Sequence, residues 1–516
     1  MTKQLYYFKF TLRFIITSLF QYFNQYLFTR KSDFKIIKAK KLNDYRENKK
    51  IDNVLFPFYD DLGTMKILLE YENKLFSSFN VKYFYALSAV DNIIRFEKFK
   101  FFSKILFKFI HSLNIKRLIS KYGINKSDYV GSNFLWPSLH NSPILLTTKE
   151  KILETKHKNI LIGDLIYDTY LRHRNKATID LNDIEFWRIY HYSFNLLDYW
   201  FKFFKSNDFK IVFLPYSTYI HWGVPSRVAL NLNIKVITFG SFLYHLSDLS
   251  EQFPFHTKNY NVYRGIFKNL KNRNQLLKDA KIRLEKRING SVDEIPYMKT
   301  SSFNKIIKQE YIVSKSKFNA VIFLHCFFDS PHVYGNLVFP DFYEWLTNIL
   351  EIASSVNETT FYVKPHPNGL IQNDVIVNNF KIKYEGRNII FLPKELSNYV
   401  IVKLKPNAIF TVYGTAGHEF AYLGIPVINA GQNPHFNYNF NYNPKTFEEF
   451  RFFVQNVGNF NLPENYDIND ILEFYYMHYM YYSPYLDCFN SNTHKDFENG
   501  KIELPVNVYI DELTFN

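Results

Sequence analysis

Short apolar runs alternate with segments of helical periodicity along most of the first half of the chain. Strands are predicted at 54–58, 81–87, 210–217 and 235–240, and helices at 64–79, 184–205 and 223–232. Strands joined by helices in this order build a parallel sheet with right-handed crossovers. The first half is therefore predicted to be a doubly wound α/β domain.

The second half shows the same alternation more regularly. Its apolar runs lie at 320–327, 360–366, 388–393, 408–414 and 426–431, and a long helix is predicted at 339–356. Nearly continuous apolar strands are typical of a sheet that is covered by helices on both faces. A charged, helix-prone stretch at 263–290 precedes this half, and the boundary is expected near 290–315.

A chain of 516 residues is too long for one hydrophobic core, so two domains are expected. We predict an N-terminal segment at 1–50, a first Rossmann-like domain at 51–300, a second at 310–450 and a helical segment at 451–516. Two doubly wound domains with a cleft between them form the architecture called GT-B among glycosyltransferases. The layout by itself does not indicate function, because many α/β enzymes share it.

Composition changes this picture little. The 54 Phe and 40 Tyr accompany an excess of Asn, Lys and Ile, a bias expected of a genome rich in A and T, so the aromatics do not indicate ligand stacking. The net charge of +15 favours anionic partners, but no motif indicates nucleic acid. Two cysteines, Cys326 and Cys488, exclude a disulfide framework and favour a cytoplasmic location.

Residues 1–50 are the place where membrane contact is expected. The apolar stretch 5–28 is interrupted by Lys9 and Arg13, and the run 14–20 that follows is too short to span a bilayer. The segment also lacks a signal-peptide cleavage site. The segment carries 12 Lys and Arg against 3 Asp and Glu, the pattern of an anchor on the inner membrane surface. The alternative is a first helix packed on its own domain with a solvated basic face.

The stretch AIFTVYGTAGHEF places small residues where a strand passes into a helix. Ligands in such sheets bind beyond the carboxyl ends of the strands, and glycines allow the backbone to approach them. Phosphate contacts are expected from Gly414, Thr415, Ala416, Gly417 and His418, and a ribose contact from Glu419. Alternatively, the turn needs small residues for packing, and a glutamate stabilises the first turn of any helix.

The stretch YVKPHPNG is the second candidate. Pro365 and Pro367 restrict the backbone on both sides of His366 and hold its ring in one direction. His366 and Lys364 are expected to donate to a phosphate that becomes a leaving group. A solvent-facing His-Pro turn is the alternative, but the two motifs are expected on nearby strand ends.

KPHP followed about 45 residues later by GTAGHEFAYLGIPV resembles the C-terminal domain of bacterial capsule and surface-polysaccharide transferases. That group includes sialyltransferase-like and Kdo-transferase-like GT-B enzymes and, more distantly, polyol-phosphate polymerases. The resemblance covers residues 320–435 and implies that His366 meets the donor phosphate and that Gly414, Thr415, Gly417 and Glu419 hold phosphate and ribose. IGDLIYDTYLR and YSTYIHWGVPSRVAL also resemble members of the group.

The catalytic base is expected among acidic residues of the first domain. Sialyltransferase-like proteins carry two acidic residues directly before a glycine, whereas here Leu62 separates Asp60 and Asp61 from Gly63. Asp164 is a second candidate, because it follows an apolar strand and could accept a proton from an acceptor hydroxyl. Asp168 and Arg172 are also cleft candidates, or an i, i+4 pair that supports a helix.

Further polar residues follow other strands. Ser217 and His221 are candidates for acceptor binding, and His325 for the donor phosphate, with Asp329 beside it. Zinc is not expected, since His325, Cys326 and His332 have no partner pair at ligand spacing. The chain contains no Asp-x-Asp triplet, which favours a site without a metal or other cofactor.

These observations favour a metal-independent glycosyltransferase that moves a sugar from a nucleotide-sugar to a lipid-linked or growing surface polysaccharide. It is expected in the cytoplasm, in contact with the inner membrane surface through its N-terminus, without nucleic acid as a partner. A CDP-polyol phosphotransferase, a nucleotide-sugar 2-epimerase and a non-catalytic assembly scaffold remain alternatives.

Overall fold

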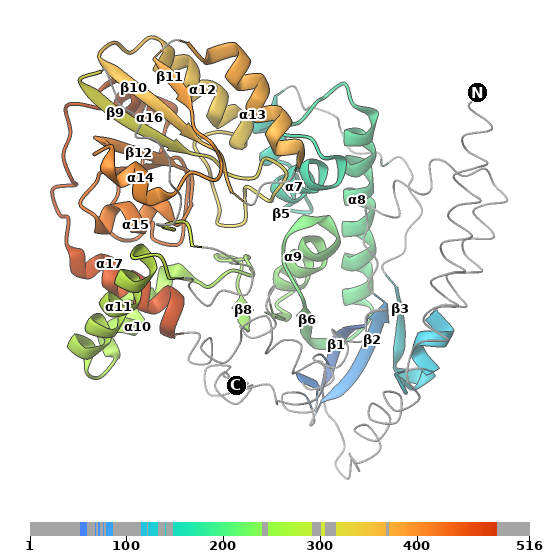
Figure 1. The fold of residues 1–516 in the computed structure, drawn as a ribbon. Coiled ribbons are helices and arrows are strands. Elements are labelled where there is room, and N and C mark those ends of the chain that lie inside the picture. The colour runs from blue at the N-terminus through green and yellow to red at the C-terminus, as the bar shows by residue number, and fades with distance from the viewer. Residues whose placement is uncertain are drawn as a thin grey trace, which may run out of the picture.

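The computed structural model contains two α/β halves, each built on a sheet (Figure 1). It describes residues 52–58, 68, 71–72, 76, 79–85, 115–120, 122–132, 140, 148–239, 246–291, 301–304, 316–367, 371–386 and 388–481. The predicted N-terminal segment 1–50, the acidic pair Asp60 and Asp61, and most of the predicted helix 64–79 lie outside these residues.

The first sheet has the strand order β3-β2-β1-β6-β7-β8. The strands span Asn53–Phe58 (β1), Asn80–Tyr85 (β2), Tyr129–Ser132 (β3), Phe209–Leu214 (β6), Lys235–Thr238 (β7) and Ser247–Leu249 (β8). All neighbours pair in parallel except β8, an edge strand that runs antiparallel to β7 and that the sequence did not predict. The chain builds outward from β1 to β3 and then restarts at β6, so the topological switch point lies between β1 and β6.

The second sheet has the order β11-β10-β9-β12-β13 and is parallel throughout. Its strands are Phe318–Phe323 (β9), Thr359–Lys364 (β10), Ile389–Phe391 (β11), Ala408–Thr411 (β12) and Val427–Asn429 (β13). All five coincide with the predicted apolar runs. The switch point lies between β9 and β12, which are neighbours in the sheet.

Helices separate most of these strands, as the periodicity predicted. They are α6 (Lys149–Leu153), α7 (Gly163–Arg174), α8 (Ile184–Lys205), α9 (Val224–Asn231), α10 (Tyr263–Asn269), α11 (Arg273–Ile288), α12 (Phe342–Ser354), α13 (Ile371–Tyr384), α14 (Asn398–Lys403), α15 (Ala416–Tyr422), α16 (Phe447–Gln455) and α17 (Ile468–Tyr475). A π-helical turn, Tyr219–Gly223, leads into α9, and another, Tyr476–Tyr481, follows α17. The helical C-terminal region is thus confirmed as far as residue 481.

The residues before α7 differ from the prediction. Ile160–Leu161 (β5) pairs only with Lys156–His157 (β4) in a two-stranded antiparallel hairpin, and does not join the main sheet. Asp164 therefore lies in the first turn of α7 and not at the end of a sheet strand.

Each sheet is covered on both faces by a hydrophobic cluster. In the first half, α7, α8 and α9 pack on one face around residues such as Trp200 and Tyr167. In the second half, α12 and α16 cover one face and α15 and α17 the other. Tyr263 of α10 and Leu284 of α11 belong to this last cluster, so both helices pack with the second sheet and lie beside α17 (Figure 1). The predicted domain limits stay a prediction.

The two halves are joined by polar contacts to the start of α12. The carboxylate of Asp341, the N-cap of α12, accepts hydrogen bonds from Tyr167 at 2.5 Å and Thr178 at 2.6 Å. Lys149 forms an ion pair with Glu344 at 2.5 Å. The structure therefore confirms the predicted class, two doubly wound α/β domains in contact, which is the GT-B arrangement.

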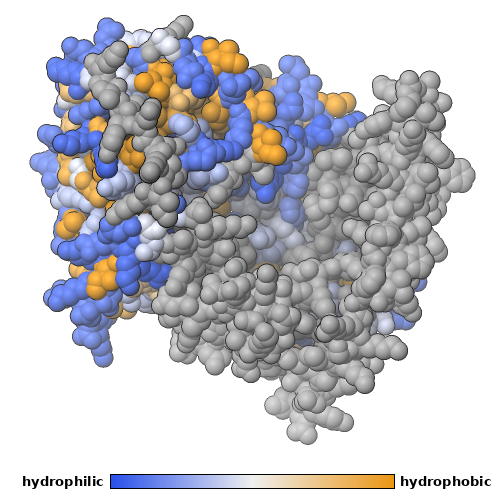
Figure 2. Space-filling model, in the orientation of Figure 1, coloured by the Kyte–Doolittle hydropathy of each residue, from blue (hydrophilic) through white to orange (hydrophobic). Residues whose placement is uncertain are grey.

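The surface carries few clues to a membrane. No helix in the described part of the chain is long and apolar enough to cross a bilayer. On the face shown in Figure 2, the second domain carries mostly hydrophilic residues with hydrophobic ones among them. Three exposed large hydrophobic residues, Ile371, Val375 and Ile382, lie on α13.

Candidate active site at the topological switch points

The predicted donor residues follow three neighbouring strands of the second sheet. His325 comes after β9, Lys364 ends β10 and is followed by Pro365 and His366, and Gly414 follows β12. Because β10 and β12 both pair with β9, the two sequence motifs lie one strand apart. In parallel α/β sheets this carboxyl edge, at the switch point, is where ligands bind.

His325 interlocks with the turn after β12. Its Nε2 lies 3.1 Å from the Thr411 hydroxyl and accepts the backbone N–H of Val412 at 3.2 Å. Burial, and to a lesser degree the nearby His366, lowers the pKa of His325 to about 3, so the ring is neutral and carries its proton on Nδ1. His325 positions the β12 turn, and only its Nδ1 remains as a donor towards a phosphate.

Gly414 is needed for this interlocking. A Cβ at this position would lie 3.1 Å from the Thr411 hydroxyl and 3.4 Å from Cε1 of His325. The backbone at Gly414 and Thr415 therefore runs close to His325, and both residues are half-buried. A Cβ here would require the Thr411 or His325 side chain to give way slightly.

Lys364 and His366 differ in accessibility. Lys364 is buried, donates to the carbonyl oxygen of Lys394, and has a pKa that burial lowers to about 8. His366 is exposed to solvent. Partial burial and the charge of Lys364 lower the pKa of His366, while the carboxylate of Asp329 acts to raise it. Of the two, His366 has the side chain that a ligand can reach, because Lys364 is buried and His366 is exposed.

The remaining residues of the GTAGHEF motif face the protein interior. A Cβ at Gly417 would lie 2.5 Å from the His435 ring, so this glycine is explained by packing. His418 is 1% exposed and packs against Phe474 of α17 at 5.3 Å between ring centroids. Burial lowers the pKa of His418 far below its usual value. The His418 ring thus lies in an aromatic cluster and does not face a ligand, and the predicted phosphate contact of His418 stays a prediction.

Glu419 also points inward. Its carboxylate accepts from Nε and Nη2 of Arg287 in α11, each at 2.7 Å, and both side chains are almost completely buried. A ribose could bind Glu419 only if this ion pair opened. The sequence did not single out Arg287, because it lies in a helix whose charged residues gave no sign of a buried partner.

In the first domain, α7 and the π-helical turn after β6 form a wall, that is, the surface that contacts the residues after β9. Arg172 donates to the carbonyl of Phe328 at 3.5 Å, and Asp168 accepts from Nδ1 of His332 at 2.6 Å. Tyr219, which has a left-handed backbone with φ of 57°, lies close to Asp329, and burial and this carboxylate raise its pKa. These contacts bring the residues after β6 and after β9 together.

The Asp168–His332 pair links the domains more clearly than the sequence indicated. Both side chains are buried, and Nε2 of His332 has no hydrogen-bond partner among the described residues. Burial raises the pKa of Asp168 to about 6, and the Asp168 carboxylate outweighs burial to raise the pKa of His332. The i, i+4 pair of Asp168 with Arg172, which the sequence left as an alternative, gives way to these contacts of each residue across the domain boundary.

Asp164 is held by an arginine. Its two oxygens accept from Nη1 and Nη2 of Arg227 in α9 at 2.6 Å and 2.5 Å. Burial would raise its pKa, but the charge and hydrogen bonds of Arg227 lower it overall. A carboxylate that is this tightly paired is a poor proton acceptor, so the geometry does not favour Asp164 as the base.

Ser217 and His221 have internal partners. The Ser217 hydroxyl accepts the backbone N–H of His256 at 2.8 Å. His221 is buried beside Tyr219, and burial lowers its pKa to about 3, which keeps the ring neutral. Both residues lie after β6 as predicted, but their side chains support the wall.

No protein-family model and no curated protein matches the sequence. Solved structures that are similar include KpsC, a β-Kdo 2,4 transferase of Thermosulfurimonas dismutans, at 14% identity over 52% of this chain and 79% of that one, with a TM-score of 0.33. The similarity to a UDP-N-acetylglucosamine 2-epimerase of Neisseria meningitidis covers 90% of this chain and 99% of that one, at 12% identity and a TM-score of 0.20. The similarity to the wall teichoic acid polymerase TagF covers 97% of this chain and 98% of that one, at 10% identity and a TM-score of 0.21.

Proposed function

We propose that this protein is a GT-B glycosyltransferase that moves a sugar from a nucleotide-sugar to a lipid-linked or growing surface polysaccharide. The observation that carries the proposal is the position of His366 and Gly414 at the switch-point edge of the second sheet. This edge faces the residues after β6 through Tyr219 and Asp329. The residues of the sequence resemblance thus lie where an α/β sheet binds its ligand.

The donor phosphates would lie between His366 and the backbone of Gly414 and Thr415. A glycine at 414 allows the close approach of a phosphate oxygen to the main chain. His366 would donate a hydrogen bond to the phosphate and offset the charge that develops as the sugar leaves. Lys364, which is buried at the end of β10, would add positive charge on the protein side of His366. No metal ion has a role in this reaction scheme.

The acceptor would lie against the first domain, and its hydroxyl needs a base. Because Asp164 is bound to Arg227, we assign this role to Asp61, with Asp60 as the alternative. Both follow β1 directly in the sequence, and β1 borders the switch point of the first sheet. A carboxylate there would face the donor edge of the second domain.

A thermal-shift screen with CMP, CDP, UDP and GDP sugars tests the class of protein. Nucleotide binding to the folded state raises the melting temperature. At a nucleotide concentration of 100 times the dissociation constant, it adds about 2.7 kcal/mol to the free energy of unfolding. A shift with one nucleotide supports an enzyme, and no shift with any of them favours an assembly scaffold. Analysis of the product then separates a glycosidic bond from a phosphodiester or from a 2-epimer formed without an acceptor.

The residue assignment is tested by four variants. His366→Ala and Asp61→Asn are expected to lower turnover by about 100-fold or more, a typical loss for a transition-state donor or a general base. His366→Ala should also weaken nucleotide binding, whereas Asp61→Asn should not. Asp60→Asn shows which of the two acidic residues is the base, and Asp208→Asn, at an exposed carboxylate of the first domain, is the matched control that retains turnover. Normal turnover by folded His366→Ala would show that the site lies elsewhere.

A further inference from the structure

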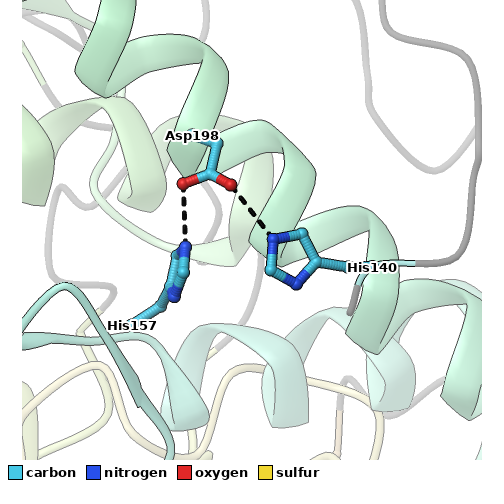
Figure 3. Close-up of side chains that lie close together, drawn as sticks. All are labelled: His140, His157 and Asp198. Atoms are coloured by element: carbon cyan, nitrogen blue, oxygen red, sulfur yellow. Dashed lines mark hydrogen bonds and ion pairs between the residues drawn. The ribbon is translucent and has the colours of Figure 1, made fainter. Parts of the chain in front are cut away.

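A second group of polar residues lies in the first domain, away from the switch-point edge. His140, His157 and Asp198 point at one another (Figure 3). Nε2 of His140 lies 3.0 Å from Oδ2 of Asp198, and Nε2 of His157 lies 2.8 Å from Oδ1. Among the described residues they are the group of three His, Cys, Asp or Glu whose ligand atoms lie within 4.8 Å of one another.

The three residues come from separate parts of the chain. Asp198 lies on α8, His157 on the short strand β4, and His140 in the segment between β3 and α6. The ring of Phe194, one turn before Asp198, packs against both imidazoles at centroid distances of 5.3 Å and 4.9 Å. This packing holds both rings with an Nε2 atom directed at the carboxylate. The sequence predicted no metal site, because no short spacing joins the three residues.

We propose that His140, His157 and Asp198 bind a divalent transition metal ion, with zinc as the best fit. Two imidazole nitrogens and one carboxylate oxygen are a ligand set that suits zinc and disfavours magnesium and calcium. Bonds of about 2.0–2.1 Å in a tetrahedron place ligand atoms about 3.3 Å apart. In this cluster the ligand atoms, one from each residue, lie within 4.8 Å of one another, so the three side chains need to approach only modestly to reach this spacing.

A water molecule would complete the coordination. The side chains of His140 and His157 are 18% and 20% exposed and that of Asp198 is 37% exposed, so the cluster opens to solvent on one side. Bound metal would connect α8 to the β4–β5 hairpin and to the segment at His140. The hairpin has only two residues per strand, and its turn residues Lys158 and Asn159 both have a left-handed backbone. The ion would stabilise this part of the first domain.

Lys158 competes with the metal. Its ammonium lies 2.8 Å from Oδ1 of Asp198 and 4.8 Å from the centre of the Phe201 ring. A divalent ion at the carboxylate would repel this ammonium. Removal of this ammonium abolishes the Lys158–Asp198 salt bridge and should therefore strengthen metal binding.

The test is a calorimetric titration of the full-length, EDTA-treated protein with ZnCl₂, together with the visible spectrum after addition of Co²⁺. One saturable site per chain is expected, with the absorption of tetrahedral cobalt. His140→Ala and His157→Ala should each weaken binding by roughly 100-fold, and Lys158→Met should tighten it several-fold. His173→Ala, at a histidine elsewhere in the same domain, is the matched control and should bind as the wild type.

Two results would overturn the proposal. One is the absence of a saturable site in the wild type. The other is undiminished zinc affinity in folded His140→Ala and His157→Ala, which would mean adventitious binding to other groups. If either alanine variant fails to fold, Asp198→Asn keeps the shape of the side chain and removes the charged ligand. Unchanged affinity and an unchanged cobalt spectrum in that variant would contradict the assignment equally.

Discussion

At the scale of single residues, His332 shows how a buried hydrogen bond can make the contact between domains sensitive to pH. Its Nδ1 donates to Asp168 at 2.6 Å, and this carboxylate raises the pKa of His332. A histidine whose pKa is higher in the folded state stabilises that state fully below about pH 6.5 and loses this contribution as the pH rises through the folded pKa.

We therefore expect wild-type protein to lose more stability between pH 6.5 and 9 than His332→Gln. Each unit by which the pKa is raised corresponds to about 1.4 kcal/mol of this difference. Urea unfolding at the two pH values measures it. The control variant His256→Gln removes a histidine whose pKa is lowered by burial, so its loss of stability between the two pH values should not be reduced in this way. Equal pH dependence of wild type and His332→Gln would contradict the assigned ion pair.

Gly163 is a residue whose role depends on close approach. A Cβ there would lie 2.0 Å from the carbonyl oxygen of Ile152, a backbone atom that cannot move aside. Gly163→Ala should lower the free energy of unfolding by at least about 1–3 kcal/mol, the usual cost of overpacking. Gly265→Ala in α10 is the matched control, because nothing lies within 4 Å of its Cβ position and alanine favours a helix. Thermal melts of both variants decide whether the α6–α7 junction is this tight.

At the scale of elements, the strands of both sheets follow the apolar runs, but the motif at α15 acts differently from its sequence interpretation. Gly414 and Thr415 remain at the carboxyl edge, as expected. The side chain of His418 turns towards α17 and that of Glu419 towards α11, while Gly417 packs against His435. The composition of the strand-to-helix turn therefore predicted its position in the sheet. The packing of α11, which precedes the turn in the chain, and of α17, which follows it, decided which side its side chains face.

The Glu419–Arg287 pair is expected to be structural. Glu419→Gln leaves a buried guanidinium without its counter-charge and should cost about 3–5 kcal/mol of unfolding free energy. The double variant Glu419→Leu with Arg287→Met removes both charges and should recover most of that loss. If Glu419 instead binds the donor ribose, the double variant would be stable but would fail to bind nucleotide. Urea unfolding and the nucleotide thermal shift, measured on the same samples, separate the two roles.

At the scale of the whole molecule, the domains meet through buried polar groups. Asp341 is fully buried and accepts from both Tyr167 and Thr178 of the first domain, besides capping α12. Such contacts allow the domains to separate more readily than an apolar interface of the same size would. Such mobility would suit the transferase proposed above, in which the domains close on donor and acceptor.

Tyr167→Phe should loosen the domain contact without altering either sheet. It removes one of the two cross-domain donors of a buried carboxylate, at a cost of about 1–3 kcal/mol. Calorimetry should show a lower first transition, and the variant should change KM for the acceptor more than nucleotide binding. Tyr466→Phe removes a part-buried hydroxyl hydrogen bond to the carbonyl of Ala421 within the second domain and is the control. A single unshifted transition in Tyr167→Phe would mean that Asp341 does not couple the domains.

Sequence alone determined the α/β class, the positions of the main strands along the chain and the loops that follow them. Apolar runs of strand length and helical periodicity are local properties, and the rules of parallel sheets convert them into a topology. The position of His366 beside the switch point followed from the same rules.

Only the tertiary structure decided which polar side chains face a ligand and which face a partner. Asp164 was bound by Arg227, Glu419 by Arg287 and Asp168 by His332, each across 60 or more residues of sequence. The same holds for His140, His157 and Asp198. Such pairs form where separate elements pack together, and the free energy that selects them depends on burial, which no local pattern of residues records.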